Sequence, residues 1–425
     1  MSEIDLEQEE WTNYHTFLVV FLSVYNFISL FSIVYTGLIL PAIAATFDIT
    51  TPAIAGIFSI IGIGVIFSVF VRRIPDKIGR KPSILIISLI YVVNLCLAAL
   101  APDLILYIIF RLITGIFAVN ISNIIIAEEM PARNRARISG IVVSIGMSSS
   151  ILASFIATFN ILALWRYFFL IVNIPGIIIF CTLWLKMKET RRYDHAKTKK
   201  KEKHSLFSIF QKKYLRIFLL TSLILFTSQW IYSGGIKRYF TVFLFEEKGF
   251  NPFSFGAFQP FRDDSFIGFL SMFAYIGSII GYWLSGYFGD RFGRKKSIYG
   301  ASCIYLAGCA LFLFGTAEVH FLIGMFTINI TFAIFSTLNQ VLSVEFWPTE
   351  QRSTISGWVF IFSSTAGIFG NMIVYYLASS YSWGFTFIVL SILPVLLIIF
   401  TSFLPETKAR VVEEIFRTEI EQKSQ

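Results

Sequence analysis

The sequence predicts an all-α membrane protein in which twelve transmembrane helices form two pseudo-repeated six-helix bundles. Three observations favour this fold class: the composition, the spacing of apolar runs and an internal repeat. Of the 425 residues, 56% are hydrophobic and only 14% are charged, and the mean hydropathy is +0.72. Soluble domains carry about 25% charged residues, so water is not the main solvent of this chain.

Twelve apolar runs are long enough to cross a bilayer as helices, which takes roughly 20 residues each. Lipid offers no partner for backbone N–H and C=O groups, and runs of this length exclude the short strands of a membrane barrel. The predicted spans cover residues 15–41, 53–71, 83–100, 103–127, 138–161, 165–185, 215–245, 265–288, 297–315, 320–344, 354–378 and 383–404.

Positive charge is concentrated in one loop. The formal net charge is +9, and residues 186–213 alone hold eleven Lys and Arg residues against Glu189, Asp194 and Glu202. A basic loop between apolar helices is a topology signal and a contact for anionic lipid. We therefore expect membrane lipid, and no nucleic acid, as a partner of this loop.

Basic residues also mark alternate loops. The loops rich in Lys and Arg lie at residues 72–81, 133–137, 186–213 and 291–296, at 352 and in the C-terminal tail. The loops between them, near residues 48, 102, 318 and 380, carry almost none, and the stretch 245–264 holds both signs. Because Lys and Arg accumulate in cytoplasmic loops, we expect both termini in the cytoplasm and the chain in the plasma (inner) membrane.

An internal repeat divides the chain in two. Asp-Lys-Ile-Gly-Arg-Lys at 76–81 returns as Asp-Arg-Phe-Gly-Arg-Lys at 290–295, an offset of 214 (290 minus 76). Glu128 and Arg135 return as Glu345 and Arg352, an offset of 217. Motifs that recur in one order at nearly one offset indicate a duplicated unit. The predicted parts are bundles at 1–185 and 215–405, a basic cytoplasmic linker at 186–214 and a cytoplasmic tail at 406–425.

These motifs resemble the Major Facilitator Superfamily. The Asp-Lys/Arg-x-Gly-Arg-Lys loops after helices 2 and 8 are similar to its signature loop. The segments at 188–192, 345–352 and 404–408, such as Leu-Pro-Glu-Thr-Lys, resemble its sugar porter and metabolite symporter branch. The resemblance implies solute binding between the two bundles and transport by alternating access. It also implies a small-molecule solute, a coupling proton and a monomer.

The charged loops are expected to act as gates. Asp76 and Asp290 can meet helix N-termini of the opposite half, where the helix dipole favours an anion. Charges at the cytoplasmic rim can pair in one state and separate in the other. The set is Arg80, Glu128, Arg135, Arg294, Glu345 and Arg352, with Glu189 and Glu406. Ordinary anchoring of helix ends is the alternative.

One position departs from the family pattern. The family usually has Gly four residues before the motif Asp, as at Gly286, whereas the first loop has Arg72. The sequence therefore does not predict close packing of the second and eleventh helices.

Charged residues inside a span are costly and mark functional sites. Arg111 begins Arg-Leu-Ile-Thr-Gly in helix 4, which resembles a family pattern whose Arg lines the cavity, often opposite an acid of helix 1. No acid occurs between His15 and Phe47, so the usual proton-coupling carboxylate is missing and a substrate anion could partner Arg111. The missing acid weakens the hypothesis of proton symport.

Helix 7 offers the second cation. Residues 229–237, from Gln229 to Lys237, resemble the sugar-binding Gln-Gln-x-Ser-Gly-Ile-Asn segment of the sugar porters, with Lys237 in place of Asn. On a continuous helix Gln229, Ser233 and Lys237 share a face and Arg238 points away. The Gly234-Gly235 pair could unwind the helix, and counting from Leu215 puts Lys237 near the far interface, so Lys237 either lines the cavity or anchors the helix end.

Three asparagines complete the predicted solute site: Asn26, Asn120 and Asn339. Their amides could bind solute or hydrogen-bond neighbouring helices. If both cations face the cavity, the solute is a small organic anion, such as a carboxylate or phosphorylated metabolite. The alternatives are a neutral sugar or other metabolite, carried by uniport or proton symport, and a receptor that binds solute without moving it.

Enzymatic activity is not expected. The four His residues lie at helix ends or in the central loop without a nucleophile or metal-ligand pattern, and no phosphate-binding Gly-rich loop occurs. The sequence therefore predicts no catalytic residue, no metal and no cofactor.

Overall fold

The computed structural model describes residues 11–119, 121–130, 135–158, 164–190, 212–249, 263–346 and 352–406. All regular secondary structure in these ranges is helical. Ten helices are long and apolar enough to cross a membrane, and the shorter segments Leu104–Ile116 and Ile141–Ile156 occupy the predicted fourth and fifth spans. The predicted all-α fold with twelve crossings is confirmed.

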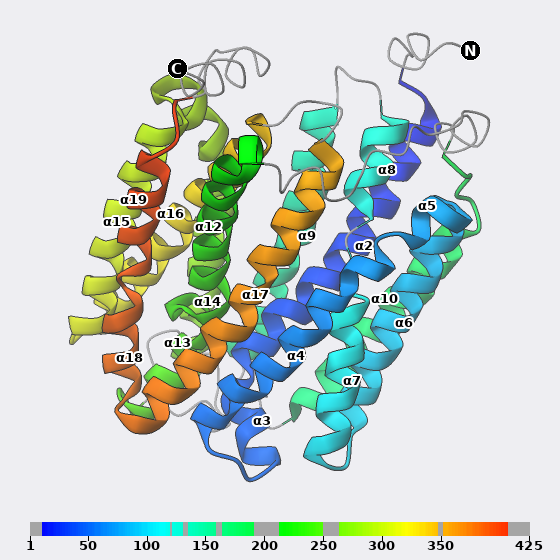
Figure 1. Cartoon of the computed structure of the whole chain (residues 1–425). Helices are drawn as coiled ribbons and strands as arrows, with labels where there is room; N and C mark the ends of the chain where they lie inside the picture. Colours follow the sequence, from blue (N-terminus) through cyan, green and yellow to red (C-terminus); the bar gives the residue numbers. More distant parts are fainter. Residues whose placement is uncertain are drawn as a thin grey trace.

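In the described residues, the first half contains six crossings built from eight helices, because its first and fourth crossings are broken, and the short helix α5 (Ile74–Ile78) follows the second crossing (Figure 1). The eight helices are α2 (Asn13–Leu38), α3 (Leu40–Thr46), α4 (Thr51–Val71), α6 (Arg80–Leu100), α7 (Leu104–Ile116), α8 (Ser122–Glu129), α9 (Arg135–Thr158) and α10 (Trp165–Trp184).

The second half repeats this order, with breaks in its first and last crossings. Its helices are α12 (Lys212–Gly234), α13 (Ile236–Glu246), α14 (Asp263–Phe292), α15 (Arg294–Phe314), α16 (Glu318–Glu345), α17 (Arg352–Ser380), α18 (Trp383–Leu390) and α19 (Leu393–Ser402).

Three of the four breaks have a local cause. Pro41 and Pro394 stand in the first turns of α3 and α19, where the missing proline N–H costs nothing. Gly235 is extended, with ψ −175°, so α12 ends and α13 restarts with a new phase. The predicted unwinding at Gly234-Gly235 is thereby confirmed.

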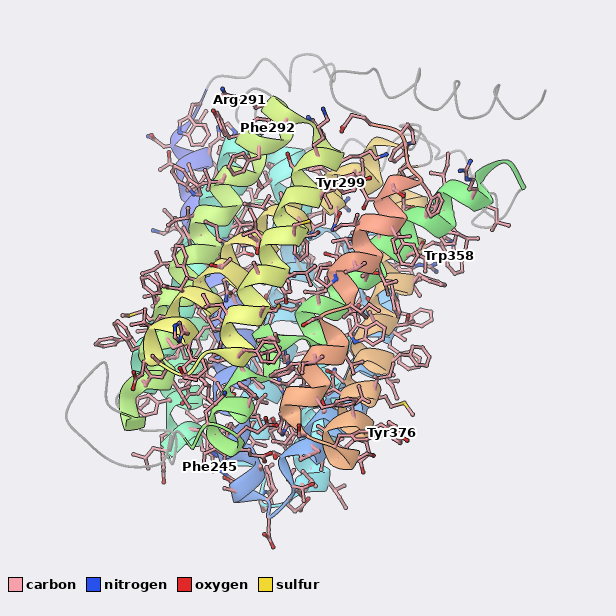
Figure 2. The ribbon with its side chains drawn as sticks, turned by 90° about the vertical axis from the view of Figure 1, so that its left-hand side faces the viewer. Phe245, Arg291, Phe292, Tyr299, Trp358 and Tyr376 are labelled. Atoms are coloured by element: carbon pink, nitrogen blue, oxygen red, sulfur yellow. The ribbon has the colours of Figure 1, made fainter. Side chains whose placement is uncertain are left out.

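The two ends of the bundle are formed by different helix ends. We call the end where α2 begins and α19 finishes the terminal end, and the end that holds α3 and the start of α18 the distal end (Figure 1). Arg291 and Phe292 lie at the terminal end of α14, whereas Phe245 lies at the distal end (Figure 2). Between the ends, large apolar side chains such as Trp283 face outward, as expected against lipid.

The most extensive contacts between the halves are those of α4 with α17 and of α9 with α14, and α13 also packs against α2 and α3. Glycines of α4 bring the first pair close, since a Cβ at Gly62 would lie 3.0 Å from Ile368 and one at Gly56 would lie 3.6 Å from the ring of Tyr375. The second and eleventh crossings therefore pack closely despite Arg72, because the small residues lie further along α4.

Candidate functional site between the halves

Two arginines, one from each half, lie within electrostatic reach of one tyrosine. The charges of Arg111 on α7 and Arg238 on α13 both act on the hydroxyl of Tyr107. The Arg238 guanidinium also stacks over the ring of Phe58 on α4, 4.2 Å from its centroid, and so contacts the opposite half. We call Arg111, Arg238, Phe58 and Tyr107 the arginine cluster.

The arginine cluster lies at one depth in the bundle. At a rise of 1.5 Å per residue, Arg111, Arg238 and Phe58 lie about 10–12 Å inside the distal ends of their helices. More tyrosines surround them, since the charge of Arg111 reaches Tyr91 of α6 and that of Arg238 reaches Tyr232 and Tyr275. The site therefore combines two cations with aromatic rings and hydroxyl groups from both halves.

Neither arginine has an acidic partner among the described residues. The Nε atoms of both are buried and have no hydrogen-bond partner there, while Arg238 also hydrogen-bonds Tyr239. The first crossing, α2 and α3, contains no Asp or Glu. Buried cations usually have an anionic partner, so this arrangement can accept an anion from outside the chain.

Lys237 points elsewhere, into the second half. Its Nζ lies 3.3 Å from Ser278 Oγ of α14 and 4.4 Å from the ring centroid of Phe332 on α16. The side chain is 8% exposed. Because α13 continues to Glu246, Lys237 is inside the bundle and not at the interface.

The remaining predicted solute residues are scattered. Asn26 donates to Ser122 Oγ (3.0 Å) and Leu22 O (2.9 Å), which ties α2 to α8. Gln229 is exposed on α12. Asn339 is fully buried, and neither polar atom of its amide has a partner among the described residues. Asn120 lies outside the described residues.

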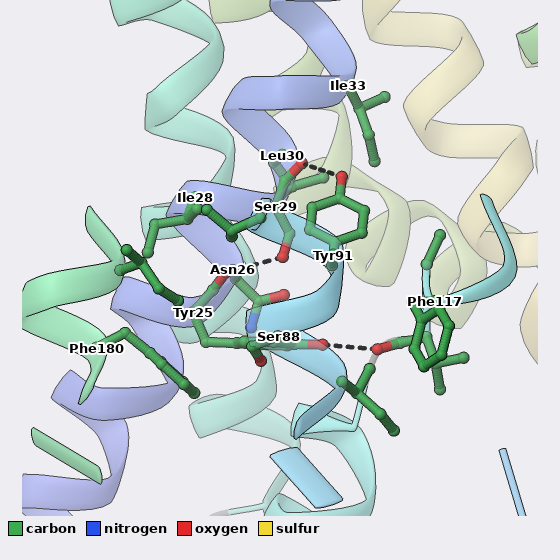
Figure 3. Close-up of a pocket in the computed structure, with 15 residues that line it drawn as sticks. Tyr25, Asn26, Ile28, Ser29, Leu30, Ile33, Ser88, Tyr91, Phe117 and Phe180 are labelled. Atoms are coloured by element: carbon green, nitrogen blue, oxygen red, sulfur yellow. Dashed lines mark hydrogen bonds between the residues drawn. The ribbon is translucent and has the colours of Figure 1, made fainter. Parts of the chain in front are cut away.

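A small cavity of about 110 Å³ lies inside the first half, between α2, α6, α10 and the break between α7 and α8 (Figure 3). At this break the hydroxyl of Tyr25 donates to Val119 O at 2.6 Å, which satisfies a carbonyl that no helix bond reaches. Tyr91 also lines the cavity, and since the charge of Arg111 reaches Tyr91, the cavity borders the arginine cluster.

The distal end is closed by contacts between the halves. Thr51 at the start of α4 donates its hydroxyl to the carboxylate of Glu246 at the end of α13. Thr241 of α13 donates to Gly37 O of α2 at 3.4 Å. Together with the stacking of Arg238 on Phe58, these bonds give α13 three separate contacts with the opposite half, at the arginine cluster and between it and the distal end.

Sequence comparison assigns the family. The sequence profile described as "Major Facilitator Superfamily" matches residues 22–261 and 259–423. The chain belongs to this superfamily. It is 25% identical to the sialic acid transporter NanX of Escherichia coli, over 79% of this chain and 80% of the relative. It is also 25% identical to the gentisate transporter of Corynebacterium glutamicum, over 77% and 73%.

A solved structure shares the fold. The inward-open xylose transporter XylE from E. coli has a TM-score of 0.75 at 17% identity and matches 95% of this chain and 99% of that chain. Together with the apolar helices, the family establishes an integral membrane protein that is a secondary transporter of small solutes.

The family's signature loops form an ion network inside each half. In the first half, the guanidinium of Arg80 binds the carboxylate of Glu128 at 2.6 Å and donates to Pro75 O at 2.7 Å. Glu189 accepts the backbone N–H groups of Arg80 (2.7 Å) and Lys81 (3.2 Å), so it caps the N-terminus of α6.

The second half repeats the cap. Glu406 accepts the N–H groups of Arg294 (2.9 Å) and Lys295 (3.1 Å) at the start of α15, and Arg294 pairs with Asp290 at 3.0 Å. All these pairs lie within one half, so in this conformation they join no opposing helices. The side chains of Asp76, Arg135, Glu345 and Arg352 lie outside what the structure describes.

Arg238 is a candidate solute-binding residue that the sequence did not predict. The helical phase turns its side chain away from Gln229 and Lys237, and in the structure this side of α13 faces the opposite half. The sequence feature that could have identified Arg238 is its charge, the second one inside the same span. No group of three or more His, Cys, Asp or Glu side chains in the described part could hold a metal.

Proposed function

We propose that the transported solute is a small organic anion, a carboxylate or phosphorylated metabolite, bound between the halves by Arg111 and Arg238. The observation that carries the proposal is that two buried guanidinium groups, both within electrostatic reach of Tyr107, have no acidic partner in the described ranges, while Arg238 contacts Phe58 of the opposite half. A planar guanidinium binds carboxylate or phosphate through two parallel hydrogen bonds. One such bond from each half makes the anion a bridge between them.

The relatives support an anion. Sialic acid and gentisate, the solutes named for the two transporters above, both carry a carboxylate. The tyrosines around the arginine cluster add hydroxyl groups and ring faces, which suit the hydroxylated remainder of such a molecule.

The proposed mechanism is rocker-switch alternating access by a monomer. The contacts of α13 with the first half close the distal end of the bundle, and their loss would open that end. We further propose that the terminal end faces the cytoplasm of a plasma membrane, because the basic segments that the structure describes, 72–81 and 291–296, lie there. The signature-loop charges would then gate the cytoplasmic side.

The test is ligand-induced thermal stabilisation of the purified chain across sugars, carboxylates, phosphates and amines. A ligand at 100 times its dissociation constant adds about 2.7 kcal/mol to the free energy of unfolding. We expect carboxylates or phosphates to stabilise the wild type. Arg111→Gln and Arg238→Gln should each weaken that binding about 10–100-fold, since a hydrogen bond to a charged group contributes about 1.5–3 kcal/mol.

Arg166→Gln is the matched control. Arg166 also stacks on aromatic rings at the distal side, with its guanidinium 5.4 Å from the centroid of Trp165 and 5.6 Å from that of Phe47, but it lies outside the arginine cluster. A neutral sugar that stabilises the protein equally in wild type and both arginine variants would overturn the anion proposal. Binding without uptake into liposomes would indicate a receptor.

A further inference from the structure

Lys237 is enclosed by neutral groups in the second half. Its Nζ has one hydrogen-bond partner in the described ranges, Ser278 Oγ at 3.3 Å. Three rings surround the rest of the head group, with centroids 4.4 Å away for Phe332 and 5.8 Å away for both Tyr232 and Tyr275.

The hydrogen-bond chain beyond Lys237 accommodates both protonation states. Ser278 Oγ donates to Asn329 Oδ1 at 3.0 Å, and the amide of Asn329 donates to Met325 O at 2.9 Å. Ser278 therefore offers a lone pair to Lys237. Both an ammonium and an amine can donate the single bond that this lone pair accepts.

The ionisable groups facing Lys237 can be named for each helix packed around it. They are Tyr232 on α12, Arg238 on α13, whose guanidinium turns to Phe58, and Tyr275 on α14. Among its described side chains, α16 contributes neutral groups, Asn329 and Phe332. No described carboxylate forms an ion pair with Lys237. A charge buried in a span without a counter-charge is costly. The protonated, charged form of Lys237 is therefore favoured only when water or an anion can reach its amino group.

Access to Lys237 depends on the distal closure. Its neighbour Arg238 contacts Phe58 of the first half, and Thr241, one turn further along α13, bonds to Gly37 O. Gly235 separates α13 from α12 immediately before Lys237. Separation of α13 from the first half would therefore bring water toward the lysine from the distal side.

We propose that Lys237 carries a coupling proton, so that the chain is a proton symporter despite the lack of an acid in its first crossing. The amine takes a proton from water on the distal side when that end is open and the solute is bound. The ammonium returns the proton to water on the terminal side after the distal end closes. The proposal requires a transported solute but is independent of whether that solute is an anion.

The proposal predicts that acidification opens the distal end. Protonation favours the distally open state, in which water reaches Lys237, over the distally closed state of this structure, in which neutral groups enclose it. One linked proton changes the ratio of open to closed by at most about tenfold per pH unit. The experiment measures electron spin distances, without solute, between labels at Asp48→Cys and Tyr381→Cys on opposite halves at the distal end. The full chain, with its native cysteines replaced, is titrated from pH 6 to 9.

The variants separate Lys237 from other groups. Lys237→Gln and Lys237→Arg should both abolish the pH response, because neither side chain changes charge in this range. Lys248→Gln should retain it, although Lys248 also lies over two rings, Phe243 and Phe321, and bonds to Leu313 O. Glu246→Gln should retain it too, which excludes the carboxylate that bonds to Thr51.

The proposal is overturned if the wild type shows no pH response, or if the Lys237 variants keep it. Should the Lys237 variants fail to fold, Ser278→Ala retains the lysine and should displace the midpoint by about one pH unit; an unmoved midpoint would also count against Lys237. Arg111→Gln should keep the pH response, so loss of the proposed anion site and loss of proton coupling give different results.

Discussion

The two ends of the molecule are held together by different kinds of contact. At the distal end, Thr51–Glu246, Thr241–Gly37 and Arg238–Phe58 all join one half to the other. At the terminal end, the described ion pairs and helix caps each stay within one half. In the proposed rocker-switch cycle the distal contacts would therefore break, whereas those terminal contacts could persist in every state.

Contacts within a half and contacts between halves should therefore affect different properties, namely folding stability and the ratio of the two conformations. A contact within a half has the same free energy in both conformations, so its loss weakens folding without favouring either state. A contact between halves contributes only to the closed state. Variants at the two ends should accordingly change different measurements, and the three below are ordered from the largest expected effect to the smallest.

Glu128→Gln should cause the largest loss of stability. The side chains of Arg80 and Glu128 are only 10% and 15% exposed, and removing one partner of a buried pair leaves the other charge uncompensated, at a cost of about 3–5 kcal/mol. We expect a lower melting temperature in detergent and an unchanged distance distribution at the distal end. Asp290→Asn is the contrast, because Asp290 is 79% exposed and such pairs contribute about 0–1 kcal/mol. Equal losses in the two variants would contradict the comparison.

Glu189→Ala and Glu406→Ala test the repeated helix caps. Each carboxylate accepts two backbone N–H groups at the start of a spanning helix, and loss of a cap costs about 0.5–2 kcal/mol. Thermal unfolding should show similar losses for both variants, since the two caps occupy equivalent positions in the repeat. A large loss of thermal stability in one variant and none in the other would mean that the carboxylate cap does not stabilise both halves in the same way.

The scaffold was largely predictable because it depends on composition and repetition. Runs of apolar residues must form helices in lipid, and the motifs at 76–81 and 290–295 recur at the starts of α6 and α15. The breaks at Ile39 and between Ile116 and Ser122 were not predicted. Apolar residues continue on both sides of each break, so hydropathy does not show where the backbone unwinds.

The site was predictable only in part. Arg111 was found because a charge inside a span is conspicuous in any sequence. The directions of Lys237 and Arg238 depend on the phase of α13 after Gly235, and a phase counted from α12 does not continue through an extended residue. Which of two adjacent cations faces the other half is a tertiary property that periodicity cannot supply.

Thr51→Val should produce the smallest free-energy change of the three. It should alter the ratio of distally open to distally closed states without a loss of folding stability. The valine keeps the shape of threonine but removes the hydroxyl that binds Glu246 across the halves, so the distally closed state should lose about 1 kcal/mol, a shift of about fivefold toward the open state. Spin labels at Asp48→Cys and Tyr381→Cys would report it as a larger fraction of long distances. Thr46→Val is the matched control, because Thr46 bonds only within its own half in the described ranges, to Ala42 O at 2.7 Å and Trp165 Nε1 at 3.0 Å. If Thr46→Val opens the distal end as much as Thr51→Val does, the hydroxyl acts through its own half and the Thr51–Glu246 contact does not select the state.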